Sequence, residues 1–507
     1  MLVTKLATLV KTREWTPDYY EHPIVTAHPD EPVFPLGLYA DFVNHSKIDA
    51  ICGITIHNLV SGTRHLSISL RRSLLCRCGC RGWCTMYSIW SFVLWGLRAL
   101  AAGAFPQARH TGAEWLVSDE VRESLAGKPL GFRGALVQIR AGWAEIAKSM
   151  GMRNWNHVVR PCPFCKTPKA MLATTTGGFG PGCEPGEPTG PATYEAECRM
   201  SEIVITLSKR DRDTLLPLLA YSFTRRGRYL VRDLPDWNLA KYDVLQPGHD
   251  LWDIGQLEYV EQFPCRVVFW RQRDDAMVLH RFPLFDLPLG ISLDTICIDQ
   301  MHTLNLGVYQ AFCLHSLWVL IKANVWRVGA HLGDRDSWAL SCEHIRGELT
   351  AFYKRMKKTY PDLSEIPHFS SSNVGGAQEW PLRAKAAQTK WLMRYVVESL
   401  TKHAPRLEHG AKLKEAGDFL VRYDMLVDSL GRQVSLPVLR NLFRNYHGYC
   451  RAAEAAGISA TPKLHLWGAY VASLSATGLS SFFGDLEGRS SEPRFTYMYE
   501  KGVCCQF

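Results

Sequence analysis

Alternating hydrophobic and polar positions predict strands near the start of the chain. Residues 35–41 (PLGLYAD) form an apolar run that ends in a carboxylate, and residues 51–60 and 64–72 alternate between apolar and polar side chains. Alternation with a period of two is typical of strands that have one buried face. Because polar turns separate the three runs, we predict a three-stranded antiparallel meander.

Helical periodicity, with apolar residues three and four positions apart, follows the meander. It predicts helices at the following positions: 86–102, 118–125, 132–150, 201–221, 300–325, 381–403, 411–430 and 437–456. Strands followed by helices predict an α/β core, and the second half is expected to be mainly helical. Residues 174–195 hold six glycines and four prolines, which predicts a loop or linker.

One apolar stretch, residues 87–105, is long enough to cross a bilayer. Arg98 lies inside it and Gly96 and Gly103 interrupt it, so we interpret it as a buried helix. Residues 1–20 contain no apolar run before a small-residue cleavage site, which argues against a secretory signal. We therefore expect a nuclear or cytoplasmic protein without a membrane anchor.

Composition narrows the class of protein further. The chain has 507 residues, of which 47% are hydrophobic and 21% charged, as in globular proteins with a large core. Sixteen cysteines in a chain of this length favour reduced thiols or metal ligands over a disulfide scaffold. The net charge of +9 is a mild bias towards polyanions such as DNA.

Two acidic positions have candidate chemistry. Asp41 ends an apolar strand, where a rigid carboxylate could help to hold two divalent cations for phosphoryl transfer, although such an Asp is often only a turn former. Asp299 and His302 are three residues apart, so a helix would place both on one face. They could bind a metal, or act as a helix cap and an ordinary polar group.

Cysteine spacing indicates a metal site. Cys162 and Cys165 form a C-x-x-C turn between prolines, a geometry that lets two thiolates bind one zinc ion. The group Cys76, Cys78, Cys80 and Cys84 is either a second metal site or a set of reduced structural thiols.

The remaining candidate functional residues are two carboxylates near the end of the chain and two groups of arginines. Asp485 and Glu487 (GDLEG) follow a helical region, where the default reading is a surface loop. Two basic groups could neutralise DNA phosphates or could simply be solvated surface: Arg71, Arg72 and Arg77, and Arg225, Arg226 and Arg228.

The ordered set of motifs resembles the cut-and-paste DNA transposases of plant CACTA elements. The matching segments are YADFVNHSKIDAICGITIHNL, CPFC, IDQMHTLNLGV, KAAQTKWLMRYVVESL, PKLHLW and GDLEG, and they span roughly residues 30 to 490. The order of these segments carries the resemblance, since each of them alone is a weak signal.

The resemblance implies an RNase H-like core, a mixed sheet split by a large helical insertion. We expect an N-terminal extension (1–29), a first core part (30–160), an insertion containing the C-x-x-C turn (161–460) and a final core segment (461–507). It also implies three acids that hold two Mg²⁺ or Mn²⁺ ions. Asp41 is then the first acid, and Glu487 or Asp485 is the third.

The second acid implied by the resemblance stands where this chain has Gly142. Glu145 is the nearby carboxylate. Asp299 is either an alternative second acid or a residue with a structural role. The resemblance further implies that histidines complete the zinc site. His465 occupies the first of these positions, His302 is a further candidate ligand, and Ala469 and Tyr470 stand where the second histidine is expected.

These expectations describe a transposase-like protein of mobile-element origin that binds DNA and forms a homo-oligomer, with no small-molecule cofactor. The replacement at Gly142 predicts that metal-dependent DNA cleavage is impaired, because a two-metal site needs its full set of oxygen ligands. The alternatives are a zinc-stabilised relic that binds DNA or protein without cutting, and, with less support, a zinc hydrolase.

Overall fold

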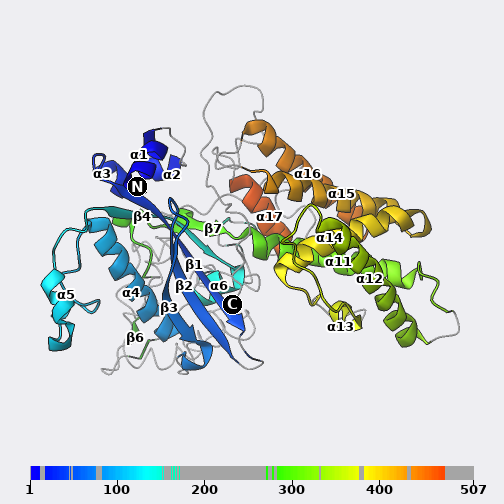
Figure 1. The fold of residues 1–507 in the computed structure, drawn as a ribbon, viewed down its shortest axis with the longest axis horizontal. Coiled ribbons are helices and arrows are strands. Elements are labelled where there is room, and N and C mark those ends of the chain that lie inside the picture. Colours follow the sequence, from blue (N-terminus) through cyan, green and yellow to red (C-terminus); the bar gives the residue numbers. More distant parts are fainter. Residues whose placement is uncertain are drawn as a thin grey trace, which may run out of the picture. The chain divides into compact units, whose positions relative to one another are not determined.

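The computed structural model divides the chain into two compact units (Figure 1). Unit 1 comprises residues 1–169 and 187–298, and unit 2 comprises residues 170–186 and 299–507. The structure describes residues 2–11, 17–44, 46, 49–75, 83–150, 152, 162, 164–165, 167, 171, 270–271, 277–278, 283–329, 333–375, 382–430 and 435–473.

A mixed sheet forms the centre of unit 1. Its described strands are β1 (Val33–Asn44), β2 (Ala50–Asn58), β3 (Arg64–Arg71), β4 (Arg133–Ala141) and β7 (Ile296–Ile298), in the order β3-β2-β1-β4-β7. β1, β2 and β3 are antiparallel, whereas β4 runs parallel to both β1 and β7. The predicted meander is therefore confirmed, and the protein is α/β as expected.

Helices pack around this sheet. The chain opens with α1 (Leu2–Lys11), α2 (Pro17–Tyr20) and α3 (Pro23–Ala27), and β3 leads into η1 (Arg72–Leu74). The predicted apolar helix is α4 (Trp83–Ala102), which lies against the sheet in Figure 1 and buries Trp90 completely. The Trp90 indole donates a hydrogen bond of 2.7 Å to the backbone oxygen of Ser149. The interpretation of this apolar stretch as a buried helix is thus supported.

The prediction of one helix over residues 132–150 is wrong. The segment forms β4, followed by the short helix α6 (Trp143–Ser149). β4 is paired along both edges, with β1 and β7, and its buried residues run consecutively instead of alternating, which shows that both of its faces are covered. A strand covered on both faces loses the period of two, and an apolar run of this kind is easily taken for a helix.

The remaining described elements of unit 1 are short. The polar helix predicted at 118–125 appears as η2 (Val117–Asp119) and α5 (Glu120–Leu125). The segments β5 (Trp270–Arg271) and β6 (Met277–Val278) form a separate two-stranded ladder, and η8 (Leu287–Leu289) and η9 (Leu293–Thr295) precede β7.

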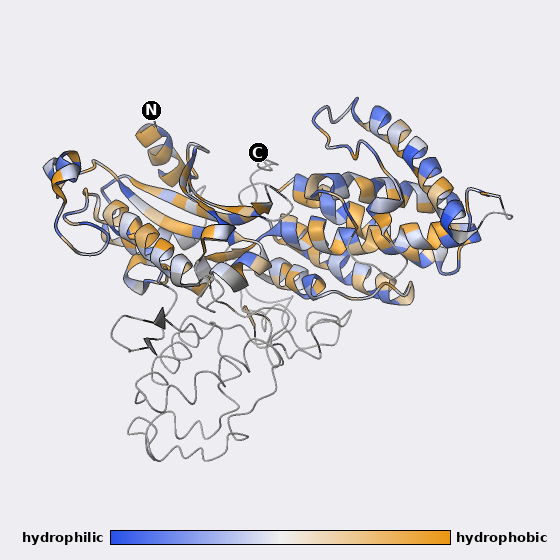
Figure 2. Ribbon diagram, turned by 90° about the horizontal axis from the view of Figure 1, so that it is seen from below, coloured by the Kyte–Doolittle hydropathy of each residue, from blue (hydrophilic) through white to orange (hydrophobic). Residues whose placement is uncertain are grey.

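Unit 2 is helical, as predicted for the second half of the chain. Its described elements are η10 (Met301–Val308), α11 (Tyr309–Lys322), α12 (Asp334–Met356), α13 (Ser371–Val374), α14 (Ala386–His403), η11 (Ala404–Arg406), α15 (Gly410–Asp428), α16 (Leu436–Ala455) and α17 (Pro462–Ser473). Hydrophobic and hydrophilic residues alternate around these helices in Figure 2, as in a bundle with an apolar core. The helices predicted at 300–325, 381–403, 411–430 and 437–456 are confirmed.

One helical run in unit 2, Met301–Lys322, is long and apolar enough to cross a membrane by composition. In its most apolar 18-residue window, 72% of the residues are buried inside the protein. Packing in the core of the bundle accounts for this composition without a bilayer.

Candidate functional site

Asp41 lies on β1, in the middle of the sheet of unit 1. It is opposite Gly53 of β2, and its side chain is half-buried. The hydroxyl of Tyr39, two residues earlier on the same face of the strand, donates a hydrogen bond of 3.0 Å to Asp41 Oδ2. The strand backbone and this hydrogen bond hold the carboxylate in place.

The strand register aligns Asp41 with the ends of two parallel strands. Ala141, the last residue of β4, pairs with both Ala40 of β1 and Ile298 of β7. The residues that follow Ala40, Ala141 and Ile298 along the chain are Asp41, Gly142 and Asp299. Position 142, where the resemblance implies the second acid, therefore directly follows the strand that runs beside Asp41.

Glu145 lies in the first turn of α6, three residues beyond Gly142, and its side chain is half-buried. Burial, followed by the charges of Glu145 and Asp41, raises the pKa of the Cys52 thiol to about 12. Both carboxylates therefore lie near Cys52, which is opposite Phe42 in β2. The structure thus brings two of the predicted acids to the same region of unit 1.

Among the described residues, Asp41 and Glu145 do not belong to a group of three side chains that could hold a metal ion. Asp485 and Glu487, the predicted third acids, lie outside the described residues. The described part of the candidate site therefore consists of two acids whose charges both act on Cys52, with glycine at the position of the implied second acid.

Asp299 and His302 form a local pair at the start of the helical unit. Asp299 Oδ2 contacts His302 Nδ1, and the same carboxylate accepts hydrogen bonds from the backbone nitrogens of Met301 (3.3 Å) and His302 (3.2 Å). Burial acts to raise the pKa of Asp299, but the hydrogen bond and charge of His302 outweigh it and lower the pKa below its usual range. These contacts are those of a helix cap, as in the structural interpretation.

The helix after this pair is irregular. η10 is a π-helix with a kink at Leu306, and the Lys463 ammonium donates a hydrogen bond of 2.5 Å to the Leu306 backbone oxygen. A Cβ on Gly307 would lie 2.4 Å from Lys463 Cδ, so only glycine leaves room for this side chain. Such π-helical segments are frequent at functional sites.

The predicted zinc ligands are buried thiols and an imidazole. Cys162 and Cys165 are 0% and 1% exposed, and His465 of α17 is 0% exposed. Burial, together with the neighbouring Cys165, raises the pKa of the Cys162 thiol well above its usual range. The Cys165 thiol donates to Thr167 Oγ1 at 3.1 Å. Cys162 and Cys165 belong to unit 1 and His465 to unit 2, and their thiol and imidazole groups are of the kinds that bind zinc.

The predicted DNA contacts are described only in part. Arg71 and Arg72 are exposed, but Arg71 Nε forms an ion pair of 2.9 Å with Asp49. The other predicted basic residues lie outside the described residues: Arg77, Arg225, Arg226 and Arg228. The predicted loop at 174–195 and the predicted helix at 201–221 also lie outside them. Cys76, Cys78 and Cys80 are also outside, and the side chain of Cys84 is not described.

The sequence interpretation missed Tyr39 and Cys52. Both lie within predicted strands of the meander, where nothing distinguishes them from other residues of the alternating pattern. The only sequence feature that could have indicated them is a hydroxyl or thiol side chain in the same meander as Asp41. The proximity of Cys52 to Asp41 depends on the register between β1 and β2, which is set by the folded sheet.

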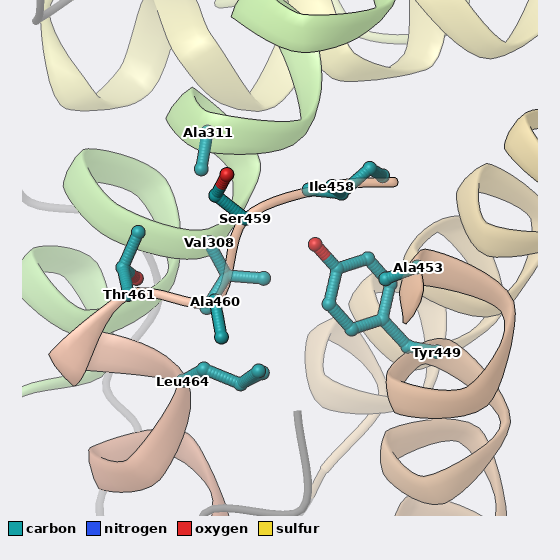
Figure 3. Close-up of a pocket in the computed structure, with 9 residues that line it drawn as sticks. All are labelled: Val308, Ala311, Tyr449, Ala453, Ile458, Ser459, Ala460, Thr461 and Leu464. Carbon is teal, nitrogen blue, oxygen red and sulfur yellow. The ribbon is translucent and has the colours of Figure 1, made fainter. Parts of the chain in front are cut away.

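A small cavity in unit 2 does not provide a substrate site. Figure 3 shows it beside Val308, Tyr449 and Leu464, with the hydroxyl-bearing residues Ser459 and Thr461. The space in this cavity that the centre of a water molecule can occupy is ≈ 10 Å³. This is room for about one water molecule.

Comparison with known proteins does not extend this picture. No protein-family model, no curated protein and no solved structure matches the chain.

Proposed function

We propose that this protein is a transposase-derived DNA-binding protein whose sheet descends from a metal-dependent DNA-cutting enzyme and whose cutting activity is impaired. The observation that carries the proposal is the register of β1 and β4. Asp41 on β1 lies beside the end of β4, and the next residue there is Gly142, the position of the implied second acid.

The arrangement of the sheet supports this origin. An antiparallel meander extended by two strands parallel to β1 is the kind of mixed sheet that an RNase H-like core requires. The proposed insertion, residues 161–460, contains β7 and most of the described helices of unit 2.

In an intact enzyme of this kind, three acids hold two Mg²⁺ or Mn²⁺ ions, and these ions promote in-line attack on a phosphodiester by water and then by a DNA 3′-hydroxyl. In this chain Asp41 would be the first acid and Glu487 or Asp485 the third. Glu145 stands one helical turn beyond the glycine, so its carboxylate has a different reach. Loss of one ligand removes charge and geometry from the metal site, and cleavage should fall accordingly.

A nicking assay on supercoiled plasmid, with either Mg²⁺ or Mn²⁺, tests the proposal. We expect the protein to retard DNA in a gel and to nick it at or near the background rate. Asp41→Ala should remove any residual nicking, whereas Asp362→Ala, at an exposed carboxylate in a loop, should leave it unchanged. Efficient nicking that depends on Asp41 would show that the enzyme is intact, and absence of DNA binding would contradict the DNA-binding part.

The second candidate is a relic that keeps a structural zinc ion. Its support is the burial of Cys162, Cys165 and His465, because structural zinc sites are closed and have no exposed position. The same burial weighs against a zinc hydrolase, which needs an open coordination position for water.

A further inference from the structure

One face of the sheet of unit 1 carries polar side chains on four strands. Facing residues across β3, β2, β1 and β4 form two adjacent rows, here called the polar rows. The first row is Arg64, His57, Gly37 and Gln138, and the second is Leu66, Thr55, Tyr39 and Arg140. None of these residues belongs to the predicted site, although Tyr39 contacts Asp41.

Arg140 is oriented by a neutral neighbour. Its Nε and Nη2 atoms donate hydrogen bonds of 3.1 and 2.9 Å to Gln138 Oε1, and Gln138 itself is 5% exposed. Gly37 makes room for this arrangement, because a Cβ there would lie 3.2 Å from Gln138 Nε2. Beside them, Thr55 Oγ1 and His57 Nε2 are 2.9 Å apart.

The cation at the centre of this inference is Arg140. Arg140 is half-buried, and the residues that the structure describes provide it with no carboxylate partner. Burial, together with the charges of Arg64 and Arg140, lowers the pKa of His57 to about 4. A half-buried cation held by an amide is costly unless an anion completes its environment.

We propose that the polar rows bind a phosphodiester group of a DNA strand, with Arg140 as the principal contact. A guanidinium has five N–H donors, and Arg140 directs only two of its nitrogens at Gln138, so donors remain for the oxygens of a phosphate. Charge-assisted hydrogen bonds of this kind are among the strongest that proteins form. This inference rests on the proposed DNA binding and names the surface that performs it.

The position of Arg140 relates this surface to the acid pair. Arg140 pairs with Tyr39 across β1 and β4, and Asp41 is two residues further along β1. Strand geometry then separates the Cα atoms of Arg140 and Asp41 by roughly 8 Å. A strand that places one phosphate on Arg140 would bring its neighbouring phosphodiester towards Asp41, so Arg140 would act as a positioning residue.

Binding of a labelled random-sequence DNA duplex by the full chain, measured by fluorescence anisotropy over a series of salt concentrations, tests the proposal. We expect Arg140→Gln to weaken binding roughly tenfold and to reduce the slope of log affinity against log salt by about one. Arg140→Lys keeps the charge but loses the planar fork, so its loss should be smaller.

The matched control is Arg122→Gln, which removes an equal charge from the exposed helix α5 of the same unit. It should bind like the wild type, and circular dichroism should show that every variant is folded. If Arg140→Gln is misfolded, the binding of Arg140→Lys tests the inference. Binding of this variant at the wild-type level, with Arg122→Gln also unchanged, overturns the inference.

A third arm distinguishes this inference from the proposed function. If the wild type binds DNA and both Arg140 variants bind equally well, the polar rows are not the contact, and only this inference fails. If the wild type binds no DNA, both fail. Binding of inorganic phosphate at low millimolar concentration by a chain that binds no DNA would identify a small-anion site instead and would also overturn the inference.

Discussion

Gly142 is the residue on which the predicted loss of activity depends. It is the N-cap of α6, with φ −64° and ψ 153°, and no side chain caps the helix there. This backbone conformation suits Asp, which is among the preferred N-cap residues. A single substitution at this position can therefore test whether the site has lost an acid, without straining the backbone.

We predict that Gly142→Asp introduces Mg²⁺-dependent nicking above the wild-type level and raises the free energy of unfolding by a few tenths of a kcal/mol. The new carboxylate would follow β4 beside Asp41 and supply the missing charge. Plasmid nicking and urea unfolding measure the two effects.

Gly142→Asn is the matched control, because asparagine caps the helix equally well but has no charge. It should gain the stability without the nicking. Equal nicking by the Asp and Asn variants, or by the wild type, would disprove the role assigned to position 142.

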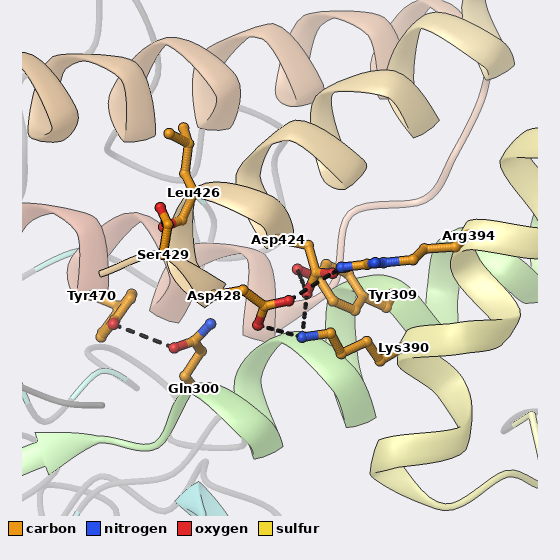
Figure 4. A network of polar contacts seen from close by, with 9 residues as sticks. All are labelled: Gln300, Tyr309, Lys390, Arg394, Asp424, Leu426, Asp428, Ser429 and Tyr470. Carbon is orange, nitrogen blue, oxygen red and sulfur yellow. Dashed lines mark hydrogen bonds and ion pairs between the residues drawn. The ribbon is translucent and has the colours of Figure 1, made fainter. Parts of the chain in front are cut away.

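At the scale of elements, a buried charge network joins three helices of unit 2. Asp424 of α15, which is 3% exposed, pairs with Lys390 (3.3 Å) and Arg394 of α14. Asp428 also pairs with both of these basic residues, and the Tyr309 hydroxyl of α11 donates to Asp424 at 3.4 Å (Figure 4). The network fixes α14 against α15 because each buried charge is compensated by its partner.

Asp424→Asn should lower the free energy of unfolding by about 3–5 kcal/mol, since it leaves two cations with one carboxylate in a buried place. Urea unfolding followed by circular dichroism measures this loss.

Asp418→Asn of the same helix breaks a more exposed pair with Lys414 and should cost less than about 1 kcal/mol. Similar losses for the two variants would show that the network contributes no more than a surface ion pair.

Helices were the elements most readily predicted from the sequence. Those of unit 2 have one buried and one exposed side, and this leaves a period of 3.6 residues in the sequence. β4 was not predicted, because its buried residues run consecutively and leave no period of two in the sequence. The three residues of β7 are likewise too few to show any pattern.

At the scale of the whole molecule, the zinc prediction concerns ligands more than 290 positions apart in the sequence, Cys162 and His465. We expect the purified protein to contain about one zinc ion per chain and Cys162→Ala to lower this content to near zero. A strong chelator should lower the melting temperature of the wild type, because structural zinc binding contributes to folding free energy.

Cys342→Ala, which removes another completely buried thiol, is the control and should keep the zinc. His465→Ala should weaken retention of zinc without abolishing it, since the two thiolates remain. Zinc content by atomic emission that is unaffected by Cys162→Ala would rule out the predicted site.

The meander, most of the helices of unit 2 and the candidate ligands could be predicted from residues alone, because these depend on local periodicity and on the chemistry of side chains close together in the chain. Only the tertiary structure decided that β4 lies beside β1, that Glu145 and Asp41 both lie near Cys52, and that Arg140 faces Tyr39. The physical reason is that pairing between distant strands is set by packing of the whole sheet, and no local pattern of residues records it.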